Sequence, residues 1–264
     1  VKQFMLHYCW ANAEEDNPPP RKKLMDWYSQ VIAGTREVKS EFLEHLRGSA
    51  EYYKAFVEPR RCTNQRERLP LTFIKALGAS RCYPLLLQAK HVLRPGDFIR
   101  LCTAVEILTF RHSTVLKWDA KRLEQVYYRL AQNIKRSSSV DEALETLREQ
   151  EAFDDDELFK TAFRSFETDN SHVAKYALYK LEEHRAPRQV DLDWDNISLE
   201  HILPRRLSWE GREEYLNRLG NLTLLSQQHN AQALNRPFSE KRTEVYSREE
   251  RISLPRDLLR YDDF

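Results

Sequence analysis

The feature that most constrains this chain is a run of helical sequence patterns that extends from its start to about residue 186. Phe98, Leu101, Val105 and Leu108 recur at the three- and four-residue spacing of a buried helix face. Only six of the 264 residues are glycine, so few turns can depend on that residue. We therefore expect a mainly α protein in which residues 1–186 form one large, all-helical domain.

The pattern changes in the C-terminal part of the chain. Ile197 and Leu199 alternate with polar residues and lead directly into His201, which is typical of a short strand. A second apolar run covers residues 222–225, and segments of helical composition follow it. The order strand, loop, strand, helix predicts a small second domain over residues 187–264.

Composition sets the broad class. The chain has 42 basic and 41 acidic residues, a net charge of +1, so the overall charge favours no particular partner. None of the four cysteines forms a C-x-x-C pair, which favours reduced thiols in a cytosolic protein. No apolar run is long enough to span a membrane and no secretory signal is present, so we expect a cytoplasmic protein.

The residues best suited to chemistry lie at the end of the first predicted strand. Adjacent strand residues point to opposite faces, so one of Glu200 and His201 can bind a metal while the other reaches a water. Hydrolysis of a phosphodiester needs a base, a cation and a group that holds the leaving oxygen. The imidazole of His201 suits the base. The oxygens of Glu200 and Asn230 suit Mg²⁺ or Mn²⁺.

Three segments in this region carry a family resemblance. They are Glu200-His201-Ile202-Leu203-Pro204, then Leu219-Gly220-Asn221-Leu222-Thr223-Leu224-Leu225, then Asn230, Asn235, Phe238 and Lys241. Together they resemble the HNH, or ββα-metal, endonucleases. More closely, they look like the C-terminal nuclease domain of GmrSD-type modification-dependent restriction enzymes and related phage-defence proteins. The nine-residue step from Asn221 to Asn230 matches the usual HNH step from the middle Asn to the last metal ligand.

The resemblance implies a role for each matching residue. His201 is expected to be the general base, and Asn221 is expected to orient the loop and the base. Glu200 and Asn230 are the expected ligands of Mg²⁺ or Mn²⁺. His229, beside Asn230, is a rival ligand.

Other matching positions have less specific roles. Lys241 is expected to contact a phosphate or to play a structural part, and Asn235 and Phe238 are supporting residues. Arg205 and Arg206 stand where the family often has Gln after the Pro, so they could add phosphate contacts or be neutral.

The implied function is that of a metal-dependent DNA endonuclease that nicks or cleaves phage or modified DNA. Full-length members of the family carry an N-terminal nucleotide-hydrolysing domain with a D-G-Q-Q-R signature, which does not occur here. The chain also starts at Val1, so we expect a fragment whose partner is that missing NTPase domain. Two alternatives remain: a catalytically silent DNA-binding or sensor module, and a helical protein-interaction scaffold.

Overall fold

The structure is a computed structural model that describes residues 1–13, 17–33, 35–150, 155–185 and 192–264. Its contacts divide the chain into two compact units, Val1–Ala162 and Phe163–Phe264. The boundary predicted between residues 186 and 187 lies outside the described residues, and the observed division comes earlier in the chain.

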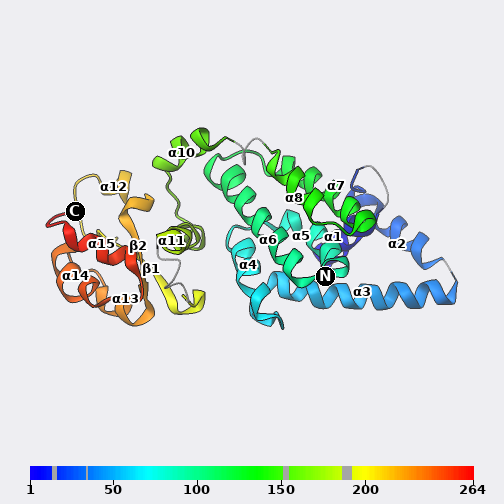
Figure 1. Cartoon of the computed structure of the whole chain (residues 1–264), viewed down its shortest axis with the longest axis horizontal. Coiled ribbons are helices and arrows are strands. Elements are labelled where there is room, and N and C mark those ends of the chain that lie inside the picture. The colour runs from blue at the N-terminus through cyan, green and yellow to red at the C-terminus, as the bar shows by residue number, and fades with distance from the viewer. Residues whose placement is uncertain (14–16, 34, 151–154, 186–191) are drawn as a thin grey trace. The chain divides into compact units, whose positions relative to one another are not determined.

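The regular elements described in the first unit are all helices, and Figure 1 labels the main ones. They are α1 (Lys2–Asn12), α2 (Leu24–Ile32), α3 (Arg36–Val57), α4 (Gln65–Ala76), α5 (Tyr83–Val92), α6 (Pro95–Thr109), α7 (Lys121–Ser137) and α8 (Asp141–Arg148), with a π-helical turn after α6 (Phe110–Val115). The end of this unit and the start of the next share α10 (Asp156–Arg164). The expected mainly α class is confirmed.

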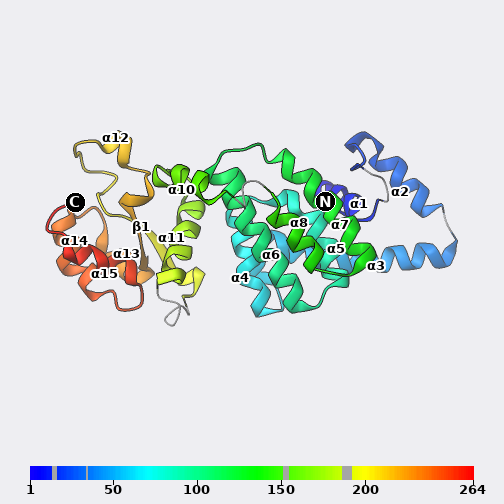
Figure 2. The same cartoon turned by 45° about the horizontal axis from the view of Figure 1, so that its top comes forward.

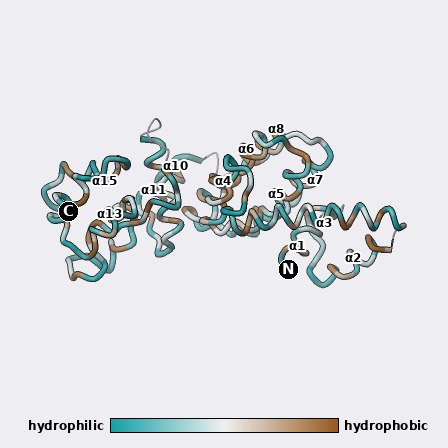
Figure 3. The backbone as a smooth tube through the Cα atoms, turned by 90° about the horizontal axis from the view of Figure 1, so that it is seen from below, coloured by the Kyte–Doolittle hydropathy of each residue, from teal (hydrophilic) through white to brown (hydrophobic). Residues whose placement is uncertain are grey.

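The core of the first unit is built around α5. Its residues Leu85, Leu86 and Leu87 are almost completely buried, and the helix contacts α1, α6 and α7. Figure 2 shows α5 among these neighbouring helices. By contrast, α3 alternates between hydrophilic and hydrophobic residues along its length (Figure 3), as expected for a helix that exposes one face.

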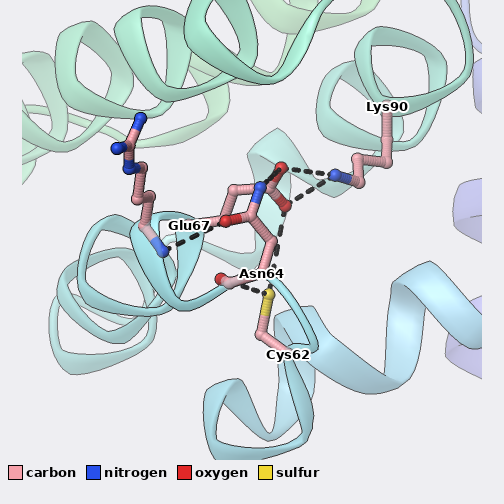
Figure 4. A network of polar contacts seen from close by, with 5 residues as sticks. Cys62, Asn64, Glu67 and Lys90 are labelled. Carbon is pink, nitrogen blue, oxygen red and sulfur yellow. Dashed lines mark hydrogen bonds and ion pairs between the residues drawn. The ribbon is translucent and has the colours of Figure 1, made fainter.

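A buried ion pair links α4 and α5 (Figure 4). Glu67 is 1% exposed, and the ammonium of Lys90 lies 2.6 Å from both of its carboxylate oxygens. The side-chain amide of Asn64 donates to the same carboxylate at 2.9 Å, and the thiol of Cys62 lies 3.9 Å from it. Both carboxylate oxygens are therefore satisfied, as a buried charge requires.

The second unit surrounds a two-stranded antiparallel sheet. It contains α11 (Ser171–Arg185), β1 (Ile197–His201), α12 (Arg212–Tyr215), β2 (Leu222–Ser226), α13 (Gln227–Ala233), α14 (Phe238–Glu244) and α15 (Ser253–Asp257). The register pairs Ile197 with Ser226 and His201 with Leu222. Helices α11 and α13 each contact both strands. This is the expected small ββα-like module, extended by helices.

Helix α11 belongs to this unit because its polar side chains bond to later segments. The ammonium of Lys175 donates to the carbonyls of Trp194 and Ile197 at 2.7 Å each. The buried carboxylate of Glu182 accepts from the backbone amides of Ser253 and Leu254 at the start of α15. These contacts explain why the second unit begins before α11 and not after it.

Candidate active site

A pocket of about 310 Å³ opens at the C-terminal end of β1. Its walls come from β1, the loop that follows it, and the turn and helix after α13. The lining residues are Ser171, Leu199, Glu200, His201, Pro204, Arg205, Arg206, Leu234, Asn235 and Lys241. Six residues that were given candidate roles from the sequence therefore meet in one cavity, although they span more than forty positions of the chain.

Glu200 is a buried acid at this site. It is 8% exposed, and its Oε1 lies 2.6 Å from the ammonium of Lys241. Burial raises the pKa of the Glu200 carboxyl because the charged form loses solvation, and Lys241 opposes this shift. Burial therefore favours the protonated form of Glu200, whereas the ion pair with Lys241 favours the charged form.

His201 presents an unsatisfied nitrogen. Its Nε2 is buried and has no hydrogen-bond partner among the described residues. Burial, together with the positive charges of Arg205 and Lys241, lowers the pKa of His201 to about 4. The imidazole is therefore uncharged at neutral pH and keeps a lone pair for a proton.

Lys241 lies at the floor of the pocket. Its side chain is fully buried, and its ammonium donates to the backbone carbonyl of His201 at 2.6 Å and of Ile202 at 3.3 Å. With Glu200, these groups place three protein oxygens around one ammonium. Of the two roles expected for Lys241, this geometry favours structural support over contact with a phosphate.

Asn221 holds the loop that follows β1. Its Oδ1 accepts from the backbone amide of Leu203 at 2.8 Å, and its Nδ2 donates to the carbonyls of Leu216 at 3.2 Å and Leu203 at 3.4 Å. The Asn221 carbonyl also accepts from the Ile202 amide at 2.9 Å. This one buried residue therefore ties down the backbone directly after His201.

Asn230 does not line the pocket. It lies on α13, which packs against β1, and its Oδ1 is buried without a hydrogen-bond partner among the described residues. Thr223 and Tyr246 likewise bury hydroxyl groups that have no partner in the described part of the chain. The second unit thus keeps several polar atoms near β1 and β2 unsatisfied, which is costly without a ligand or water.

The rival ligand His229 is already engaged. Its Nδ1 lies 2.9 Å from the carboxylate of Glu249 and 3.1 Å from the hydroxyl of Ser226. Glu249 is 1% exposed, and its pKa is lowered because hydrogen bonds from Ser226 and His229 outweigh the opposing effect of burial. His229 is therefore fixed in orientation by its neighbours.

The sequence analysis missed several residues of the site. Glu249 is one of the many acids near the C-terminus, and nothing local distinguishes it. Leu234 and Ser171 line the pocket only because the chain folds back there. Arg206, by contrast, was singled out from the sequence together with Arg205, and both line the pocket.

The pocket brings together a neutral imidazole, a carboxylate and two arginines, which are groups that can act on a phosphodiester. Residues 153–264 match the family described as GmrSD restriction endonucleases, C-terminal domain. The match confirms the resemblance seen in the sequence and supports a nuclease, the nuclease part of a restriction system, for this part of the chain. No curated protein matches the chain.

Two searches of the described residues bear on the remaining expectations. No described helix is long and apolar enough to cross a membrane. Across those same residues, no group of three or more His, Cys, Asp or Glu side chains is arranged to hold a metal ion. All four cysteines are buried, and none of them forms a disulfide.

Proposed function

We propose that the second unit is an HNH-type endonuclease that hydrolyses phosphodiester bonds of DNA with the help of a divalent cation. The observation that carries the proposal is the buried Nε2 of His201, which has no hydrogen-bond partner in the described part of the chain and belongs to a residue that shares a pocket with Glu200 and Arg205. A buried nitrogen without a partner is costly unless a bound molecule satisfies it.

His201 is the general base in this proposal. Its Nε2 takes a proton from a water as the water oxygen bonds to phosphorus and the bond from phosphorus to the leaving sugar oxygen breaks. A pKa near 4 keeps the imidazole free of a proton at neutral pH. A phosphate anion that enters the pocket would raise this pKa and make the base stronger.

The neighbouring residues bind and position the substrate. Arg205 and Arg206 line the pocket with exposed side chains, and a guanidinium is well matched to phosphate oxygens. Asn221 and Lys241 position the site without contacting substrate, since they hydrogen-bond to the backbone of Leu203 and of His201. Asn235 also lines the pocket and is assigned a supporting role.

Glu200 and Asn230 remain the proposed ligands of the cation, Mg²⁺ or Mn²⁺, although Asn230 lies on α13 and does not line the pocket that contains Glu200. The unsatisfied Oδ1 of Asn230 and the carboxylate of Glu200 are hard oxygen donors of the type that these ions prefer. With only two such donors, most of the ion's ligands would be waters and phosphate oxygens, which fits the lack of a dense acidic cluster among the described residues. When bound, the ion supplies positive charge that stabilises the phosphate in the transition state.

The substrate in this proposal is phage or modified DNA, and the partner is an N-terminal nucleotide-hydrolysing domain. Both come from the resemblance stated for the sequence motifs, and the family match over residues 153–264 supports DNA as the substrate. A cytoplasmic location agrees with such a role.

A plasmid-nicking assay tests the proposal. The purified chain should convert supercoiled plasmid to the open-circular form with Mg²⁺ or Mn²⁺ and should lose this activity in EDTA. His201→Ala should reduce the rate by about a hundredfold or more because it removes the base. His172→Ala, at an exposed histidine of α11, is the matched control and should nick like the wild type. Equal nicking by the wild type and a folded His201→Ala variant would contradict the assignment. DNA binding without cleavage under any metal would instead favour a silent binding module.

A further inference from the structure

The turn between α13 and α14 contains a leucine in an unusual backbone conformation. Leu234 has φ 47° and ψ −137°, and the carbonyl of Ala233 accepts from the amide of Arg236 at 3.2 Å. Leu234 therefore occupies the second position of a turn of the mirror-image type II′, a position that glycine dominates. A Cβ in this region is strained, and strain of this kind gathers at functional sites.

Ser138, another residue with a positive φ, does not share this conformation. Ser138, at the end of α7, has φ 52° and ψ 23°, which is the ordinary left-handed helical region. That region is open to many residues at helix ends, whereas the backbone of Leu234 is not. Leu234 is thus the residue whose identity conflicts with its own backbone.

Burial does not explain the conflict. Leu234 is 67% exposed, although its neighbours Ala233 and Phe238 are buried in the core of the second unit. A single exposed leucine is ordinary on a protein surface. Little apolar burial within the fold offsets the strain at Leu234. We therefore looked for a contact that its side chain could make with a bound molecule.

The position of Leu234 at the candidate active site indicates what its side chain could contact. Leu234 lines the same pocket as Glu200 and His201, and Arg205 and Arg206 lie on the same pocket wall. A DNA strand presents phosphates for the arginines and apolar sugar and base surface beside them. Proteins that bind DNA insert leucine and similar side chains against such surface.

We propose that Leu234 is a DNA-contacting residue that packs against the sugar and base surface next to the phosphate held in the pocket. The proposal rests on the proposed function for its substrate, but it concerns binding and positioning and not the chemical step. The strained turn would then keep the apolar side chain of Leu234 exposed at the pocket.

The experiment separates function from folding by using glycine. Leu234→Gly relieves the strain, so its melting temperature should equal or exceed that of the wild type. Its affinity for a fluorescein-labelled DNA duplex, measured by anisotropy in EDTA, should fall about tenfold, the size expected for one leucine contact. Leu234→Ala should lose the same affinity without the gain in stability. Leu259→Ala, at an exposed leucine in an ordinary conformation, should bind like the wild type.

Each outcome decides the proposal. Binding by Leu234→Gly and Leu234→Ala within twofold of the wild type would overturn it, and so would a wild type that fails to bind duplex. A loss of binding that comes with a lower melting temperature in Leu234→Gly would show a structural role and also overturn it. If the wild type binds and Leu234→Gly binds poorly, yet no variant nicks plasmid, the leucine contact stands and the proposed nuclease function fails.

Discussion

The two units each bury a lysine–glutamate pair, and the pairs differ in how completely their oxygens are satisfied. In the first unit, Glu67 accepts from Lys90 with both oxygens and from Asn64 with one. In the second unit, the ammonium of Lys241 lies beside one oxygen of Glu200, and the pKa of Glu200 is raised by burial. The first pair is closed within the fold, whereas the second leaves part of a carboxylate facing a pocket.

Neutral polar groups in the two units can be compared in the same way. The hydroxyls of Thr109 and Tyr127 lie 3.2 Å apart in the core of the first unit. The buried hydroxyl of Thr223 in the second unit has no partner among the described residues, and neither has Nε2 of His201. Such groups are not confined to the second unit, since Oε1 of Gln88 in the first unit also has no partner among the described residues. In the second unit several of them belong to residues of β1, β2 and α13, where a bound ligand would satisfy them.

The largest expected effect tests the closed pair. Glu67→Gln leaves the charge of Lys90 largely desolvated and uncompensated, and should lower the free energy of unfolding by about 3 kcal/mol. Urea denaturation measures the change. Glu51→Gln, which removes an exposed partner of Lys54, should leave the free energy of unfolding nearly unchanged, because solvent screens a surface ion pair. Equal effects of the two variants would mean that the buried pair is no more stabilising than a surface pair.

An intermediate effect separates two asparagines of the candidate site. Asn221→Ala removes the partners of the Leu203 amide and the Leu216 carbonyl and should cost about 2 kcal/mol. Asn230→Ala removes an unsatisfied oxygen and should change stability by about 0.5 kcal/mol at most. Both variants should lose plasmid nicking. If Asn230→Ala unfolds as readily as Asn221→Ala, Asn230 is a structural residue and not a ligand.

The smallest effect compares two threonines. Thr109→Val leaves the buried hydroxyl of Tyr127 without this partner and should destabilise the protein by about 1 kcal/mol. Thr223→Val replaces an unsatisfied buried hydroxyl by a methyl group and should be neutral or stabilising. Thermal unfolding of the two variants checks the sign. A destabilising Thr223→Val would show that a bound water already satisfies the hydroxyl.

Local sequence predicted much of the fold and part of the site. The spacing of Phe98, Leu101 and Val105 predicted a helix, and α6 spans Pro95–Thr109. The alternation of Ile197 and Leu199 predicted β1, which ends at His201 as expected. These inferences succeeded because helix and strand periods are properties of neighbouring residues.

Other features depended on contacts between distant segments. The pairing of Glu249 with His229 joins residues twenty positions apart, and that of Lys241 with Glu200 joins residues more than forty apart. The predicted domain division also missed α11, because Lys175 and Glu182 bond to residues that follow them by about twenty to seventy positions. No local pattern reports which of several acids or lysines will be buried.

The order of helices and strands, and the acid-histidine pair at a strand end, were determined by sequence alone, because backbone sterics and apolar spacing act over a few residues. Only the tertiary structure decided that Lys241 is buried beneath Glu200, that His201 keeps a bare nitrogen, and that Leu234 stands strained and exposed at the same pocket. Those outcomes depend on which polar groups are buried next to one another. Burial is set by how distant segments pack, so it cannot be predicted from neighbouring residues in the sequence.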